Sequence, residues 1–134
     1  MRRLAIDVQP HEYTVLRLDP AIPIPAELFA STGLLSIIRT EAELSVVCLS
    51  GHVESLVAQR SEAGWRLLTV RGPLEFSLTG IMAMLAGTLA AAGVALFALS
   101  SFDTDHVLVK EGDLDRAIRA FREAGHEVNS ATRE

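Results

Sequence analysis

The stretch that decides the fold is residues 80–110, which read GIMAMLAGTLAAAGVALFALSSFDTDHVLVK. Its first part, residues 80–92, carries no charge and repeats its larger apolar side chains at helical spacing, which predicts a buried helix. Gly93 then provides the left-handed residue at which helices commonly end. The remainder forms two β-rich runs, 94–101 and 106–110, joined by a linker short enough for a hairpin. The stretch therefore predicts a helix followed by two antiparallel strands.

A further strand is expected before this stretch, and a second helix followed by a short strand is expected after it. The apolar positions of that helix form one stripe, with charged residues between them: Leu114, Ala117, Ile118 and Phe121. Asp113 stands where an N-cap is expected, and Gly125 where the helix should stop. A strand at 65–71 or at 74–78 precedes the first helix, and a short strand at 126–128 follows the second. The order is therefore βαββαβ, the ferredoxin-like arrangement.

The same order of elements occurs earlier in the chain. It consists of a strand at 13–18, a short helix at 25–30, strands at 34–39 and 44–49, and a helix through Val53, Leu56 and Val57. In this copy Gly33 and Gly64 are expected to end the helices. The predicted fold class is α+β: two ferredoxin-like (βαββαβ) repeats, 1–64 and 65–134, with antiparallel sheets and helices packed on one face. The strand near Trp65 is compatible with either repeat.

The composition excludes some classes of partner. The net charge is −5 and no basic run is longer than Arg2-Arg3, so the chain lacks the basic stripe that nucleic-acid binding requires. The single cysteine, Cys48, excludes an intrachain disulfide framework, and we expect it to be a small buried apolar residue. Since no signal sequence is recognisable, a cytoplasmic location is expected.

One segment is apolar enough to suggest a membrane helix. Residues 76–102 carry no charge and are long enough to span a bilayer. Glycines punctuate the segment, however, and its many alanines make it only mildly apolar. We expect a buried helix followed by a buried strand, and no membrane partner.

The sequence contains no residue pattern typical of an enzyme. The histidines are His11, His52, His106 and His126, and their spacing fits no zinc signature. Neither a nucleophile elbow nor a phosphate-binding glycine loop is present. We therefore expect no catalytic residue, no metal and no cofactor. Trp65 is interpreted as a packing anchor, and His52 and His126 as surface residues.

The most polar constellation lies in the hairpin, where residues 100–106 include two serines and two aspartates. These residue types are ordinary turn formers. Alternatively, hydroxyls and a carboxylate at a strand end can bind the ammonium group of a ligand. Thr79, Gly80 and Ile81, at the start of the long helix, offer the complement, because its free N–H groups and positive dipole end suit a carboxylate. An α-amino acid needs both kinds of group.

Residues 65–81, 92–94, 97–105 and 107–110 resemble the ACT domain family, in particular its arginine-sensor type, and are similar to the regulatory ACT domains of aspartate kinases. The resemblance covers residues 65–128. It implies a non-catalytic regulatory protein that binds an amino acid at an interface between ACT units. Because four-stranded sheets leave open edges, we also expect a homodimer.

The resemblance also implies which residues bind the ligand. Gly80 and Ile81 match the loop that holds the ligand's backbone atoms, and Ser101, Phe102 and Asp105 match a segment that closes over an amino acid. With the neighbouring threonine, the predicted ligand-binding set is Thr79, Gly80, Ile81, Ser101, Phe102 and Asp105. The first repeat lacks this motif. The alternative function is a structural or protein-interaction module with a vestigial ligand site.

Overall fold

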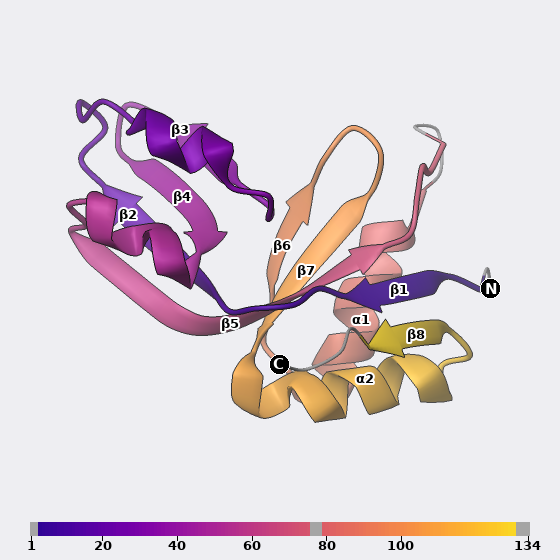
Figure 1. The fold of residues 1–134 in the computed structure, drawn as a ribbon. Helices are drawn as coiled ribbons and strands as arrows, with labels where there is room; N and C mark the ends of the chain where they lie inside the picture. Colours follow the sequence, from indigo (N-terminus) through magenta and orange to yellow (C-terminus); the bar gives the residue numbers. More distant parts are fainter. Residues whose placement is uncertain (1–2, 76–78, 131–134) are drawn as a thin grey trace. The chain divides into compact units, whose positions relative to one another are not determined.

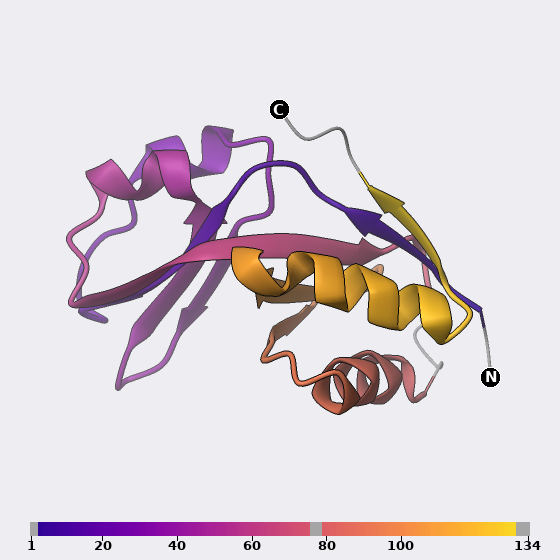
Figure 2. The ribbon, with the colours of Figure 1, turned by 90° about the horizontal axis from the view of Figure 1, so that it is seen from below.

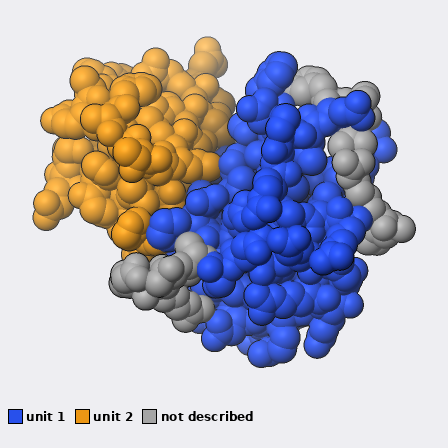
Figure 3. Space-filling view, turned by 45° about the vertical axis from the view of Figure 1, so that its right-hand side comes forward, with its two compact units in different colours: residues 1–10, 66–134 blue, residues 11–65 orange. Residues whose placement is uncertain are grey.

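The computed structural model describes residues 3–75 and 79–130. The chain divides into two compact units, one of residues 1–10 with 66–134 and one of residues 11–65 (Figure 3). The first ten residues thus belong to the later unit, whereas the sequence analysis assigned them to the first repeat. The strand near Trp65, which the sequence left to either repeat, contributes residues to both units.

Strands and helices alternate along the chain. In order they are β1 (Ala5–Val8), β2 (Tyr13–Leu18), the 3-10 helix η1 (Ala26–Ala30), β3 (Ser36–Arg39), β4 (Leu44–Leu49), the 3-10 helix η2 (Ser50–Ser55), β5 (Arg60–Val70), α1 (Ile81–Ala91), β6 (Phe97–Ser100), β7 (Asp105–Lys110), the 3-10 helix η3 (Glu111–Asp113), α2 (Leu114–Glu123) and β8 (Glu127–Ser130) (Figure 1). Both predicted helices of the later unit and its hairpin are confirmed. Of the strand expected at 74–78, residues 74 and 75 lie outside any strand, and 76–78 lie outside the described residues.

The sheet of the unit formed by residues 1–10 and 66–134 is mixed. β5 pairs with β7 on one side and, antiparallel, with β1 on the other. β1 then pairs with β8 in parallel, with Ile6 opposite Val128, while β6 pairs antiparallel with β7. The prediction of a purely antiparallel sheet was wrong for this unit. The reason is β1, a strand that the sequence analysis did not anticipate, which lies between β5 and β8.

Both helices of this unit lie on one side of β1 and β5 (Figure 2). Leu85 and Leu89 of α1 and Phe121 of α2 are buried in one cluster with Val107 and Val109 of β7. Burying such side chains stabilises a fold by about 1.5–3 kcal/mol each. This core fixes the start of α1 against the β6–β7 hairpin.

The C-terminal ends of the two helices agree with the sequence analysis. Gly93 and Gly125 adopt left-handed φ angles of 75° and 96°, as expected of residues that stop a helix. Asp113 directly precedes α2, but its side chain makes no capping hydrogen bond. Its Oδ1 instead lies 3.6 Å from Nη1 of Arg116, one turn further along the helix.

The unit of residues 11–65 has an antiparallel sheet, in which β2 lies between β4 and β5, and β3 pairs with β4. The short helix predicted at 25–30 is present as the 3-10 helix η1. The helix predicted through Val53, Leu56 and Val57 was wrong, since the 3-10 helix η2 occupies its place and ends at Ser55. The sequence of η2, SGHVES, is too short and too poor in apolar side chains for an amphipathic helix. Val57, predicted on the apolar stripe, is 76% exposed.

The glycines of this unit also differ from the prediction. Gly64 lies inside β5 with a φ of 84°, opposite a register shift between Tyr13 and Val15, so its conformation serves a β-bulge. Gly33 does not adopt a left-handed φ. A Cβ at Gly33 would lie 2.7 Å from Oη of Tyr13, so glycine is required there for space. Oη of Tyr13 accepts a hydrogen bond from the N–H of Leu34 at 3.0 Å.

The burial predicted for individual residues agrees with the structure at some positions and differs at others. Cys48 and Trp65 are buried, as predicted. His126 was predicted at the surface, but it is only 5% exposed, because its Nδ1 accepts a hydrogen bond from the N–H of Leu4 at 3.1 Å. His52 is half-buried. Within residues 3–75 and 79–130, no helix is long and apolar enough to cross a membrane.

Candidate functional site

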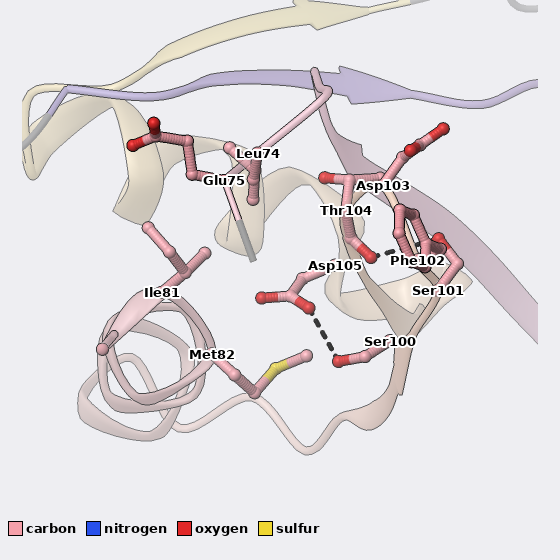
Figure 4. Close-up of a pocket in the computed structure, with 11 residues that line it drawn as sticks. Leu74, Glu75, Ile81, Met82, Ser100, Ser101, Phe102, Asp103, Thr104 and Asp105 are labelled. Carbon is pink, nitrogen blue, oxygen red and sulfur yellow. Dashed lines mark hydrogen bonds between the residues drawn. The ribbon is translucent and has the colours of Figure 1, made fainter. Parts of the chain in front are cut away.

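A cavity of about 300 Å³ lies between the end of the β6–β7 hairpin and the start of α1 (Figure 4). Its described lining comes from the segment after β5, the first turn of α1 and the hairpin: Leu74, Glu75, Gly80, Ile81, Met82, Ser100, Ser101, Phe102, Asp103, Thr104 and Asp105. All of these residues belong to the unit formed by 1–10 and 66–134.

The start of α1 forms one wall of the cavity. Gly80 precedes the helix with φ 83°, a left-handed conformation that L side chains rarely adopt, and its carbonyl accepts the N–H of Met84 at 2.9 Å. The N–H groups of the first turn have no carbonyl one turn earlier to bond to, so they are available to a ligand. A Cβ at Gly80 would meet nothing within 4 Å. Glycine is therefore required there by its φ, not by a close neighbour.

The hairpin end forms the opposite wall. Ser100 and Asp105 face each other across the hairpin, and Oγ of Ser100 donates to Oδ1 of Asp105 at 2.7 Å. The N–H of Ser101 donates to the carbonyl of Thr104 at 2.9 Å, which closes the turn. Figure 4 shows the carboxylate of Asp105 pointing towards Ile81 at the start of α1. The hairpin thus presents fixed acceptor groups to the helix N-terminus.

The charges around the cavity have one sign. Glu75, Asp103 and Asp105 contribute three carboxylates, and no Arg, Lys or His occurs among the described lining residues. Such a wall suits an ammonium or guanidinium group, because charge-assisted hydrogen bonds to carboxylates are the strong ones. The positive end of the α1 dipole is the complementary place for a ligand carboxylate.

His106 lies directly behind this wall and was not among the predicted site residues. Its Nδ1 lies 3.0 Å from Oγ1 of Thr69 on β5, and its Nε2 lies 3.1 Å from Oγ of Ser101. Burial lowers the pKa of His106, while the negative charge of Asp105 acts in the opposite direction. The sequence could not reveal this arrangement, because Thr69 is 37 residues away along the chain.

The structure brings together most of the predicted ligand-binding set. Gly80, Ile81, Ser101, Phe102 and Asp105 line the cavity. Thr79 is exposed beside Gly80 and is not one of the described lining residues. Phe102 is 80% exposed, and in Figure 4 its ring lies near Ser101, away from the helix.

The sequence analysis missed several lining residues. Leu74 and Glu75 are brought to the cavity when the N–H of Leu74 donates to the carbonyl of Asp103 at 2.7 Å. Ser100 could have been found from strand pairing, since it is the cross-strand partner of Asp105. Within the part of the chain that the structure describes, no group of three or more His, Cys, Asp or Glu residues could hold a metal ion.

Comparison with known proteins identifies the fold of this unit. The family model described as "ACT domain" matches residues 60–123. Over 68 residues, half of the chain, the sequence is 37% identical to the human protein named "Cytosolic arginine sensor for mTORC1 subunit 1". The chain contains an ACT domain at residues 60–123. It spans only 21% of the length of that human relative. A second family model, described as an N-terminal domain, matches residues 11–55.

Solved structures match the fold over most or all of the chain. An X-ray structure of a protein from Agobacterium tumefaciens matches with a TM-score of 0.86 and 32% identity, over 100% of this chain and 98% of that one. The regulatory subunit of aspartate kinase from Thermus thermophilus, in a ligand-free form, matches with a TM-score of 0.62 and 13% identity, over 87% of this chain and 93% of that one. At that identity the second match reflects a shared fold.

Proposed function

We propose that this protein is a non-catalytic regulatory ACT protein that binds an amino acid in the cavity between α1 and the β6–β7 hairpin. The observation that carries the proposal is the pairing of two walls across one cavity. Asp105 and Ser101 offer acceptors at the hairpin, and Gly80 and Ile81 lie at the helix N-terminus. An α-amino acid carries the two opposite charges that these walls would accept.

The size of the cavity also supports an amino acid. At about 300 Å³ it lies at the lower end of the range for small-molecule sites, about 300–1,000 Å³. Leu74, Ile81 and Met82 supply apolar lining for the carbon atoms of a ligand side chain. The carboxylates of Glu75 and Asp103 would favour a ligand whose side chain is neutral or positively charged over an acidic one.

The relatives point in the same direction. The human relative is named an arginine sensor, and the Thermus thermophilus protein is a regulatory subunit. We extend from them a regulatory, amino-acid-binding and non-enzymatic role, and a cytoplasmic location. We further propose that the chain comprises two ferredoxin-like ACT repeats, the first divergent, with the ligand site in the second at Thr79, Gly80, Ile81, Ser101, Phe102 and Asp105.

A homodimer is part of the proposal. Ala83, Gly87 and Ala90 are exposed on α1 without a charge among them, so a second copy could approach that face closely. Among the described strands, β3, β6 and β8 each pair on one side only, which leaves edges for a partner to cover. Light scattering coupled to size-exclusion chromatography tests this part: the dimer mass supports it, and a monomer at all accessible concentrations contradicts it.

A thermal-shift screen of the protein against the proteinogenic amino acids tests the ligand-binding function. A ligand that binds only the folded state at 100 times its Kd stabilises it by about 2.7 kcal/mol, which is a shift of several degrees. We expect at least one amino acid to raise the Tm with a saturable dose dependence. If none does, the site is vestigial and the protein is a structural or interaction module.

A further inference from the structure

The hydroxyl of Ser101 lies within hydrogen-bonding distance of two other groups. Its Oγ lies 3.2 Å from the carbonyl oxygen of Thr104 and 3.1 Å from Nε2 of His106. A serine hydroxyl has one hydrogen to donate and two lone pairs with which to accept. A carbonyl oxygen can only accept, so the hydrogen of Ser101 is committed to Thr104.

By distance alone the contacts of His106 allow either tautomer, and the hydrogen bond from Ser101 to Thr104 favours one of them. When Ser101 donates to Thr104 it has no second hydrogen to give, and Nε2 is then the donor to its Oγ. The neutral imidazole then carries its proton on Nε2, and Nδ1 is an acceptor. In that tautomer Oγ1 of Thr69, 3.0 Å from Nδ1, is the donor to it and completes a chain from β5 through His106 to the turn.

We propose that His106 is a positioning residue for the amino-acid site, which fixes Ser101 as a hydrogen-bond acceptor towards the cavity. This inference rests on the proposed function of the cavity. Two of the three hydrogen-bonding positions of the Ser101 hydroxyl are used by Thr104 and His106. The remaining lone pair is the only one left for a ligand, and it can only accept.

The consequence is a chemical specificity for this end of the site. The carboxylate of Asp105 also offers only acceptors: its Oδ1 accepts from Ser100 at 2.7 Å, which leaves Oδ2 for the ligand. Ser101 and Asp105 therefore present acceptors and no donor to the ligand. This wall takes an N–H group, such as an ammonium or guanidinium, and rejects a carboxylate or phosphate.

A double-mutant cycle tests whether His106 acts through Ser101. The variants are His106→Phe, Ser101→Ala and the double variant, with calorimetric titration of L-arginine, or of whichever amino acid the thermal-shift screen selects. Losing one neutral hydrogen bond weakens binding by roughly 2- to 12-fold. We expect that loss in His106→Phe and no further loss when it is added to Ser101→Ala. Independent losses that multiply in the double variant overturn the proposal.

A conservative variant separates positioning from packing. In His106→Gln the amide nitrogen reaches the position of Nε2 and can still donate to Ser101, so we expect affinity within about 2-fold of wild type. His106→Phe keeps the bulk but cannot donate. Equal loss in both variants contradicts the proposal.

A measurement without ligand keeps this inference distinct from the proposed function. The ring nitrogen shifts of His106 in ¹⁵N NMR spectra report its tautomer in the wild-type protein. A proton on Nε2 supports the hydrogen-bond chain, and a proton on Nδ1 overturns it, even if a variant fails to fold. If no amino acid binds the wild type, the proposed function falls, while the tautomer still decides the chain from Thr69 to Ser101.

Discussion

Replacing Asp105 by asparagine separates the structural role of this carboxylate from its role in binding. In the folded protein Oδ1 of Asp105 accepts from Ser100 at 2.7 Å, and an asparagine oxygen can accept the same bond. The second carboxylate oxygen is the acceptor that we assign to the ligand. In Asp105→Asn it becomes an NH₂ group, which opposes an ammonium instead of accepting from it.

The expected loss follows from the type of bond removed. A hydrogen bond to a charged group contributes about 1.5–3 kcal/mol, which corresponds to about 10- to 150-fold in Kd. Asp105 is half-buried, so solvent screening reduces this interaction only in part. The stability of the free protein should change little, because the contact with Ser100 is retained.

Asp103→Asn is the matched control. Asp103 lies in the same hairpin and lines the same cavity, but it is exposed. An exposed ion pair contributes about 0.2–1 kcal/mol, so its loss should weaken binding no more than about 5-fold. Calorimetric titration gives the affinities, and melting without ligand gives the stabilities. If Asp105→Asn loses melting temperature but keeps its affinity within about 2-fold, Asp105 only stabilises the turn and the binding role is wrong.

Three further predictions concern stability. Gly80→Ala should destabilise the protein by about 1–2 kcal/mol in urea unfolding, because φ is 83° there. Gly112→Ala, where a Cβ meets nothing within 4 Å and φ is not left-handed, should change stability by less than about 0.5 kcal/mol; equal effects would contradict this account of the glycine. Gly33→Ala should cost about 1–3 kcal/mol, since its Cβ would lie 2.7 Å from a tyrosine hydroxyl, while Gly51→Ala, which meets nothing within 4 Å, should change stability by less than about 0.5 kcal/mol. Burial, together with the charge of Arg3, lowers the pKa of His126, so the unfolded chain binds the proton more readily than the folded one. The free energy of unfolding should therefore keep its full value above about pH 6.5 and decrease below that pH. In urea titrations at several pH values, His126→Phe should make this decrease smaller.

The elements with strong local signals could be predicted from the sequence. α2 has apolar residues at 114, 117, 118 and 121 with charges between them, and all four are buried. α1 and the hairpin are delimited by Gly80, Gly93 and the polar turn. The candidate site could be predicted from these elements, because the start of α1 and the end of the hairpin both lie within residues 80–110.

What depended on distant pairing could not be predicted. Residues 4–8 have an alternating pattern, with Leu4, Ile6 and Val8 buried, but nothing local indicates that β1 lies between β5 and β8. The burial of His126 depends on Leu4, which is 122 residues away in the chain. Of the two helices expected in residues 11–65, the second was wrong for a local reason. Three apolar positions sufficed to suggest the second of them, but they are too few to cover a sheet.

The central claim, that an amino acid binds between α1 and the β6–β7 hairpin, is tested most directly by amide shift mapping. ¹⁵N-labelled protein is titrated with the amino acid selected by the thermal-shift screen, or with each proteinogenic amino acid if none is selected. The account predicts saturable shifts concentrated at Gly80, Ile81, Ser101 and Asp105, with the amides of residues 11–65 unchanged. Saturable shifts confined to residues 11–65, or none with any amino acid, would contradict it.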